Sequence, residues 1–249
     1  VLPTALPMLF LTKLLSQTPL YFRLTRRLCP LFRPFGVSYA GGGCAILSFL
    51  SGYPAGSRAI ADAYEQGAIP KDELLRAAAL STTSGPAFLV GVAGVAMAGD
   101  ATSGWIMYLS HLAGVLLPVW FLARFSSRKA TSSAPPPIHT TDTQALQSSV
   151  FAVLTVGGAI ALFYCFGCML TDLLSFLPLP DTLCNVLTGL VEMTTGCAHL
   201  LTDKCASSIS LCVFLVTFGG GCVLLQQWTF LCKTPIRLRQ FLSIKLLQA

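Results

Sequence analysis

The chain has 249 residues, of which 54% are apolar and 10% are charged. A soluble domain carries about 25% charged residues, so this composition excludes an ordinary soluble protein and predicts several membrane spans of about 20 residues each. The net charge is +6, but the basic residues gather in short loops between apolar runs. This distribution follows the positive-inside bias of membrane proteins and argues against a nucleic-acid-binding function.

The first half of the chain is predicted to contain a span, a basic loop, a glycine-rich apolar segment, a broken span, a tight loop and a second span. The basic loop carries four arginines and could contain an interfacial helix. In chain order, these elements occupy residues 1–20, 21–36, 37–66, 72–97, 99–103 and 104–124.

The same order of elements returns in the second half, after a linker that is rich in Ser, Thr and Pro. We therefore divide the chain into a first gate-like repeat at 1–124, a cytoplasmic linker at 125–148 and a second, inverted repeat at 149–249, whose C-terminus we expect to be truncated. In chain order, the elements of the second repeat occupy residues 149–171, 172–181, 182–203, 205–231, 232–239 and 240–249.

Each repeat is interrupted by two glycine motifs inside segments that are apolar enough to enter a bilayer. The first repeat carries Gly-Tyr-Pro-Ala-Gly at 52–56 and Ser-Gly-Pro at 84–86, and the second carries Glu-Met-Thr-Thr-Gly at 192–196 and Phe-Gly-Gly-Gly at 218–221. A broken helix at membrane depth frees backbone groups that lipid cannot hydrogen-bond, so it is tolerated only where protein or a water-filled cavity receives those groups. Corresponding breaks in two halves of a chain are typical of secondary transporters with a site near the midplane.

The charges of matching loops predict that the two repeats face opposite sides of the membrane. Loop 21–36 has four basic residues, whereas its counterpart at 172–181 has two aspartates and no basic residue. Loop 99–103 has only Asp100, whereas its counterpart at 232–239 has three basic residues. With the basic loops inside, each glycine-motif segment must enter and leave the membrane on one side. The predicted fold is an all-α polytopic membrane protein with an inverted structural repeat, opposed re-entrant helical hairpins and discontinuous transmembrane helices.

Polar residues near the motifs predict the binding site. Glu192 lies in an apolar run, where a carboxylate usually faces a cavity, a cation or a proton path; the alternative is a hairpin tip that water reaches. His111 lies within a span, as either a hydrogen-bonded packing residue or a proton relay. Gln226 and Gln227 follow the second break and could line a cavity. The residues at 51–57 are predicted to form a hairpin tip that binds a ligand; the alternative is a tight turn that contacts no ligand. The candidate substrate- or ion-binding residues are Ser51, Gly52, Tyr53, Gly56, Ser57, Thr83, Ser84, Gly85, His111, Glu192, Thr194, Thr195, Gly196, Gly220 and Gln226.

Five motifs resemble those of the YlbJ-type sporulation integral membrane proteins, and the resemblance covers nearly the whole chain. The motifs lie at 51–57, 81–86, 110–111, 192–196 and 218–220. That family falls within the wider nucleoside-recognition, or gate-domain, group, which includes concentrative nucleoside transporters and the membrane part of ferrous iron transporters. The resemblance implies an integral membrane protein with two gate repeats and a role in spore cortex formation, and it implies no particular substrate.

Together, these observations predict a multi-pass protein of the cell membrane that transports or conducts a small polar solute or ion, with Na⁺ or H⁺ as a coupling ion. The alternative is a non-transporting membrane scaffold that is needed for spore envelope assembly. The sequence has no Ser-His-Asp order, paired catalytic carboxylates or metal-ligand cluster, so we expect no enzyme activity, no metal and no other cofactor. The lipid bilayer is the expected partner, and a homo-oligomer is left open.

Overall fold

The computed structural model describes residues 18–125, 142–203 and 205–249, and every regular element in these ranges is helical. Nearly all of the predicted first span at 1–20 and most of the linker at 125–148 lie outside the described residues. The helices of the predicted first repeat are α2 (Pro19–Phe32), η1 (Arg33–Phe35), α3 (Tyr39–Ser51), α4 (Ala55–Glu65), α5 (Lys71–Leu80), η2 (Ala87–Ala98) and α6 (Ala101–Arg124). Those that follow are α7 (Asp142–Leu174), α8 (Asp181–Val191), α9 (Met193–Leu200), α10 (Ala206–Phe218), α11 (Gly220–Leu231) and α12 (Leu238–Gln248).

Three stretches of the described chain are long and apolar enough to cross a membrane. They coincide with three of the spans expected from the sequence, so the all-helical class is confirmed and three of the expected spans are present as candidate membrane spans. The three stretches are Ala101–Arg124, Ser149–Leu174 and Ala206–Leu231.

The helices are interrupted at all four glycine motifs. The chain leaves helix between α3 and α4 and again between α5 and η2. Glu192 alone separates α8 from α9, and Gly219 alone separates α10 from α11. The backbone of Gly219 has a φ of 102°, a left-handed conformation that glycine adopts without the steric cost of a Cβ atom. The discontinuities predicted from the sequence are therefore present.

The segment at 21–36 is mostly helical, so the helix that the sequence allowed within this basic loop is present and occupies most of it. Helix α2 begins where the Thr18 side chain accepts the backbone N–H of Tyr21 at 3.2 Å, and Pro19 at the first position is preorganised for a helix. Tyr21 and Thr25 are buried, whereas the arginines of α2 are exposed. The segment is thus an amphipathic helix with a basic outer face.

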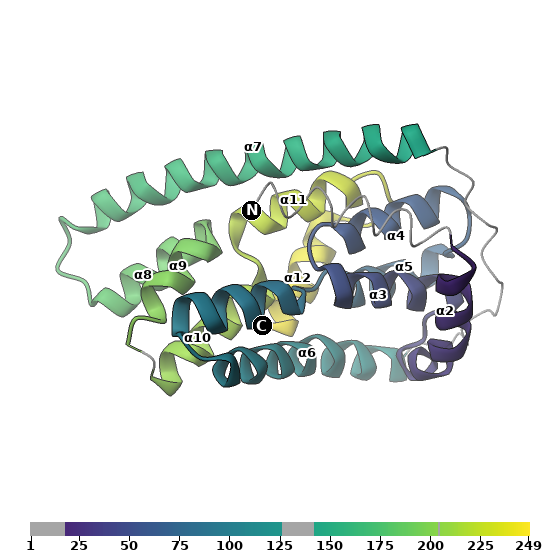
Figure 1. Ribbon diagram of the computed structural model, residues 1–249, viewed down its shortest axis with the longest axis horizontal. Coiled ribbons are helices and arrows are strands. Elements are labelled where there is room, and N and C mark those ends of the chain that lie inside the picture. The colour runs from purple at the N-terminus through teal and green to yellow at the C-terminus, as the bar shows by residue number, and fades with distance from the viewer. Residues whose placement is uncertain (1–17, 126–141, 204) are drawn as a thin grey trace.

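The apolar side chains form two main cores at opposite ends of the long axis. Helices α3, α4 and α5 lie toward one end and α8, α9 and α10 toward the other, with α7 along one long edge and α6 along the opposite edge (Figure 1). The first core, here called the α3–α5 core, includes Ile60 and Leu74. The second, here called the α9–α10 core, includes Cys197 and Leu215. Helix α6 contributes to both.

One face of α6 shows what separates the two cores. Met107 belongs to the α9–α10 core, and Val115 and Val119 belong to the α3–α5 core. His111 lies between them and is fully buried. Residues four apart share a helix face, and at about 1.5 Å per residue they are about 6 Å apart along the axis. The buried imidazole of His111 therefore separates the two apolar cores on this face of α6.

Gly56 offers a test of how closely the first two breaks pack. An alanine methyl group at Gly56 would overlap the carbonyl oxygen of Ser81 and the side chain of Ser48. We expect Gly56→Ala to destabilise the protein by about 1–3 kcal/mol, the usual cost of overpacking a core. Gly158→Ala on α7 is the matched control, since its methyl group would meet nothing within 4 Å. Thermal unfolding in lipid nanodiscs measures both, and an equal effect of the two changes would contradict this packing.

Candidate functional site: a buried polar layer at the helix breaks

Side chains from distant elements satisfy the carbonyl groups that are freed where α5 ends. The Ser81 carbonyl accepts the hydroxyl of Ser48 on α3 at 2.9 Å, and the Thr82 carbonyl accepts the ammonium of Lys245 on α12 at 2.9 Å. The Ala79 carbonyl accepts the amide of Gln248, also on α12, at 3.0 Å. Because a buried carbonyl group without a donor is costly, the break depends on α3 and α12 for its stability.

His111 satisfies the other side of the break and joins it to the second repeat. The backbone N–H of Ser84 donates to Nε2 of His111 at 3.0 Å, so Nε2 carries a lone pair. The Nδ1 atom lies 2.9 Å from the Thr217 hydroxyl oxygen, and Thr217 donates its own proton to the Val213 carbonyl at 2.7 Å. The proton of the imidazole must therefore sit on Nδ1 and be donated to Thr217. His111 is therefore neutral and links the segment between α5 and η2 to α10.

Lys245 is the most unusual side chain of this layer, and sequence reasoning missed it. It is fully buried, its ammonium has the single hydrogen bond to Thr82, and it lies 5.9 Å from the centre of the Tyr53 ring. Among the described residues, no carboxylate lies within ion-pair distance of it. A buried ionisable group without a counter-ion is costly and is a candidate for a functional role. The signal available in the sequence was a single lysine between apolar residues near the C-terminal end.

The hairpin tip at 51–57 lies directly against the first break. An atom added at the Cβ position of Gly52 would come within 2.6 Å of the Gly85 nitrogen, so only glycines allow this approach. The Tyr53 hydroxyl donates to the Val216 carbonyl at 2.5 Å, which ties the tip to α10. The structure thus brings together the two predicted motifs of the first repeat and one turn of the second repeat. We call the hydrogen-bonded set of Ser48, Tyr53, Thr82, Thr83, Ser84, His111, Thr217, Lys245 and Gln248 the polar layer.

The predicted hydroxyl groups of the first repeat fall into two kinds. The Thr83 hydroxyl lies 2.8 Å from that of Ser48, and the Ser51 hydroxyl donates to the carbonyl of Leu47 in its own helix. The hydroxyls of Ser57 and Ser84, by contrast, are fully buried and have no hydrogen-bond partner in the described part of the chain. Ser51 is thus occupied locally, whereas Ser57 and Ser84 remain available.

Glu192 is held by its own helix. Its backbone is extended and its carboxylate caps the N-terminus of α9. One oxygen accepts the Thr194 N–H at 3.1 Å and hydroxyl at 2.5 Å, and the other accepts the Thr195 N–H at 2.7 Å and hydroxyl at 2.8 Å. Such a cap satisfies orphan N–H groups and places negative charge at the positive end of the helix dipole. Glu192, Thr194 and Thr195 therefore form one structural unit, and within the described part of the chain this unit shares no hydrogen bond with the polar layer.

The glycines of the second repeat bring its two breaks together. Gly189 and Gly196 face each other in the α8–α9 hairpin, and a Cβ atom at Gly220 would lie 2.8 Å from the Gly189 carbonyl oxygen. On α11, Gln226 donates to the Cys222 sulfur at 3.1 Å. Its neighbour Gln227 is fully buried, with no hydrogen-bond partner for either amide atom among the described residues. Of the two glutamines weighed from the sequence, Gln227 is the one left available.

The capping role of Glu192 gives a sharp stability test. Glutamine would place an NH₂ group where one carboxylate oxygen now accepts two hydrogen bonds, so we expect Glu192→Gln to cost about 1–2 kcal/mol of stability, the usual loss of an N-cap. Asp203→Asn, at an exposed position in the turn after α9, is the control and should change stability by less than about 0.5 kcal/mol. Equal melting temperatures for Glu192→Gln and the unmodified protein would show that this cap is not formed.

Comparison with known proteins gives a relative that matches the whole chain. The chain aligns with the sporulation integral membrane protein YlbJ of Bacillus subtilis (strain 168), with 28% identity over an alignment of 291 positions that covers 100% of this chain and 71% of that protein. No family model matches the chain, and no solved structure matches it significantly. The full-length similarity confirms the resemblance seen in the glycine motifs and supports a YlbJ-type assignment, that of a sporulation integral membrane protein.

Proposed function

We propose that this protein is a membrane transporter or channel for a small polar solute or ion, that it acts in sporulation, and that its binding site is the polar layer together with nearby buried groups that lack partners. Five side chains carry the proposal because each has a buried polar atom without a hydrogen-bond partner in the described residues. They are Ser57, Ser81, Ser84, Gln227 and Gln248.

The cost of these atoms favours a ligand over a purely structural role. Leaving a buried polar group unsatisfied costs about 1–3 kcal/mol, whereas an apolar group of similar shape costs nothing of this kind. All five are at most 3% exposed. Four of them come from α4, the first break and α12, next to the network that holds the break open, and Gln227 comes from α11. A passing solute or water that hydrogen-bonds to these groups accounts for their retention.

The pairing of helices supports an inverted repeat. Helix α3 packs on α2 and α4 as α8 packs on α7 and α9. The hairpin of each repeat also contacts the half-helix that follows the break of the other repeat: α4 contacts α11, and α9 contacts η2. The α3–α4 and α8–α9 hairpins lie toward opposite ends of the molecule (Figure 1). In this proposal they are re-entrant hairpins that enter from opposite sides, within the repeats at 1–124 and 149–249.

The charges at the two ends give the proposed orientation. At one end, Gly36 lies beside Arg76 and Ala123, and Arg237 and Arg239 lie near Leu122. At the other end, Asp100 caps the start of α6 and α8 begins at Asp181, and the loops at 99–103 and 172–181 lack basic residues. With the basic end in the cytoplasm, the protein is a multi-pass protein of the cell membrane. Rocking of one repeat against the other would expose the polar layer to each side in turn.

Two groups are candidates for coupling to Na⁺ or H⁺. Each oxygen of Glu192 already accepts two hydrogen bonds, so a cation there would have to displace hydroxyl donors. Lys245 has three N–H donors and one acceptor, the Thr82 carbonyl. A neutral Lys245 amine could still donate a hydrogen bond to the Thr82 carbonyl. Protonation of Glu192 would disturb the four hydrogen bonds that its carboxylate accepts. Lys245 is therefore the stronger candidate for carrying H⁺.

The second candidate function is a membrane scaffold for spore envelope assembly. It is favoured by the completeness of the network around the first break, since the carbonyls of Ala79, Ser81 and Thr82 and the N–H of Ser84 all have protein partners. The break is therefore held open without any ligand. The two functions differ in what they require of the groups that have no partner.

Gln227→Met separates the two functions. Methionine has a similar shape and removes two unpartnered polar atoms, so we expect the melting temperature to rise by a few degrees, at about 2–4 °C per kcal/mol for a chain of this size. If the amide binds a solute, the same variant should fail to support spore formation when it replaces the native chain in its host. Unfolding in nanodiscs and counts of heat-resistant spores measure the two effects.

Leu225→Met on the same helix is the matched control, because Leu225 is exposed on the outer surface and should tolerate methionine in both assays. Normal sporulation with a stabilised Gln227→Met protein would contradict the transporter and favour the scaffold. A melting temperature that falls instead would show that the amide has a partner and would remove the observation on which the proposal rests.

Two cysteines test the orientation. Cys205 is exposed at the start of α10, where hydrogen bonds from Ser207 and then Ser208 lower the pKa of its thiol to about 7. Cys232 is exposed at the end of α11. With every other cysteine replaced, an impermeant maleimide should label Cys205 in intact cells and Cys232 only after permeabilisation. Because the thiolate reacts, labelling of Cys205 should slow as the pH falls below 7 and level off above about 8. The reverse pattern of access would contradict the proposed orientation.

A further inference from the structure

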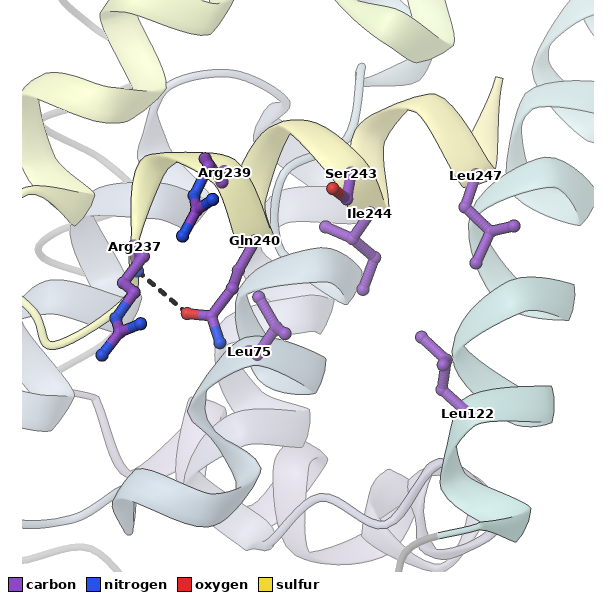
Figure 2. Close-up of a pocket in the computed structure, with 8 residues that line it drawn as sticks. All are labelled: Leu75, Leu122, Arg237, Arg239, Gln240, Ser243, Ile244 and Leu247. Atoms are coloured by element: carbon purple, nitrogen blue, oxygen red, sulfur yellow. Dashed lines mark hydrogen bonds between the residues drawn. The ribbon is translucent and has the colours of Figure 1, made fainter.

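A pocket of about 500 Å³ opens at the basic end of the molecule, between α12, α5 and α6. One part of its lining is polar and comes from the first turns of α12. The rest is aliphatic and comes from all three helices (Figure 2). The lining residues are Leu75, Leu122, Arg237, Arg239, Gln240, Ser243, Ile244 and Leu247. This pocket lies apart from the polar layer and takes no part in the proposed transport site.

The charge of the pocket is positive and uncompensated. No carboxylate lines it, and among the described residues neither Arg237 nor Arg239 has an acidic side chain within ion-pair distance. The Gln240 side-chain oxygen accepts the backbone N–H of Arg237 at 3.0 Å, which fixes the start of α12 and leaves both guanidinium groups free to bind a ligand (Figure 2). Guanidinium groups bind phosphate oxygens in a bidentate geometry.

The aliphatic part of the lining is open to the outside. Leu122 is 36% exposed and Leu247 is 56% exposed, and both lie on the side of the pocket away from the arginines (Figure 2). A free inorganic anion would contact only the arginines and leave these leucines uncovered. A ligand with an anionic head and a hydrocarbon tail would satisfy both parts of the lining.

We propose that this pocket binds one anionic phospholipid, with its phosphate on Arg237 and Arg239 and the upper part of an acyl chain along Leu122 and Leu247. The location fits, since the arginines lie at the end that the positive-inside bias places at the cytoplasmic leaflet, where anionic lipids meet basic pockets between helices. The lipid would join α12, which supplies Lys245 and Gln248 to the polar layer, to α5 and α6.

Native mass spectrometry of the purified protein, loaded in nanodiscs with equal parts phosphatidylglycerol and phosphatidylcholine, tests the proposal. The unmodified protein should retain one phosphatidylglycerol in preference to phosphatidylcholine. The double variant Arg237→Gln, Arg239→Gln should lose about tenfold or more of that retention, given two basic contacts. The control is Arg23→Gln, Arg26→Gln, which removes the same charge from the exposed face of α2 and should retain the lipid.

A second variant distinguishes lipid binding in the pocket from attraction of lipid by surface charge. Ser243→Trp keeps every arginine but fills the space between the head and tail positions, so retention should fall as far as in the arginine variant. Melting temperatures show whether each variant is folded. The proposal would be overturned by equal retention of the two lipids, equal loss in the α2 control, unchanged retention in Ser243→Trp, or displacement of the lipid by millimolar inorganic phosphate. A folded protein that retains no lipid, because another segment of the chain covers the pocket, would also overturn it.

Discussion

The structure depends on how the backbone groups at the end of α5 are hydrogen-bonded. Helix α5 stops at Leu80, and six residues pass before η2 begins. Of these residues, Ser81 to Ser84 are buried, so their backbone groups need partners within the protein. Ser48, Lys245 and Gln248 donate to the freed carbonyls, and His111 accepts the Ser84 N–H. Each of these side chains comes from a helix that is remote in sequence, so the break holds only when α3, α6 and α12 are assembled around it.

This dependence explains the division of the molecule into two apolar cores. The polar layer lies between the α3–α5 core and the α9–α10 core, and α6 passes through all three levels. Apolar contacts are close-packed and resist small displacements, whereas a level built from single hydrogen bonds can exchange partners with water or a solute. In the proposed transporter, motion of one repeat against the other would therefore be concentrated at the polar layer. The same arrangement would serve a scaffold as a rigid joint, and the unpartnered Gln227 and Ser84 are what favour a binding role.

The helical membrane class, the breaks and the hairpin tips could be predicted from the sequence, because glycine, proline and apolar runs act locally. The partners of the breaks could not, since they depend on tertiary contacts: Lys245 reaches Thr82 across 163 positions of the chain. Glu192 shows the opposite difficulty. Its place in an apolar run predicts a functional carboxylate, but the Glu-x-Thr-Thr order also makes an N-cap, and the structure shows that local role. In the segment at 21–36, the arginines predicted a basic connection, and the burial of Tyr21 and Thr25, one helical turn apart on α2, shows that this connection is an amphipathic helix.

The most direct test of the account is the protonation of His111 in lipid bilayers. Solid-state ¹⁵N NMR of protein with labelled histidine, with His139 and His199 replaced, measures the shifts of both ring nitrogens. The account predicts a neutral ring with its proton on Nδ1 and with Nε2 accepting the Ser84 N–H. A ring protonated on Nε2, or a doubly protonated ring at neutral pH, would contradict it, because the N–H of Ser84 would then have lost its partner and the break could not be held as described.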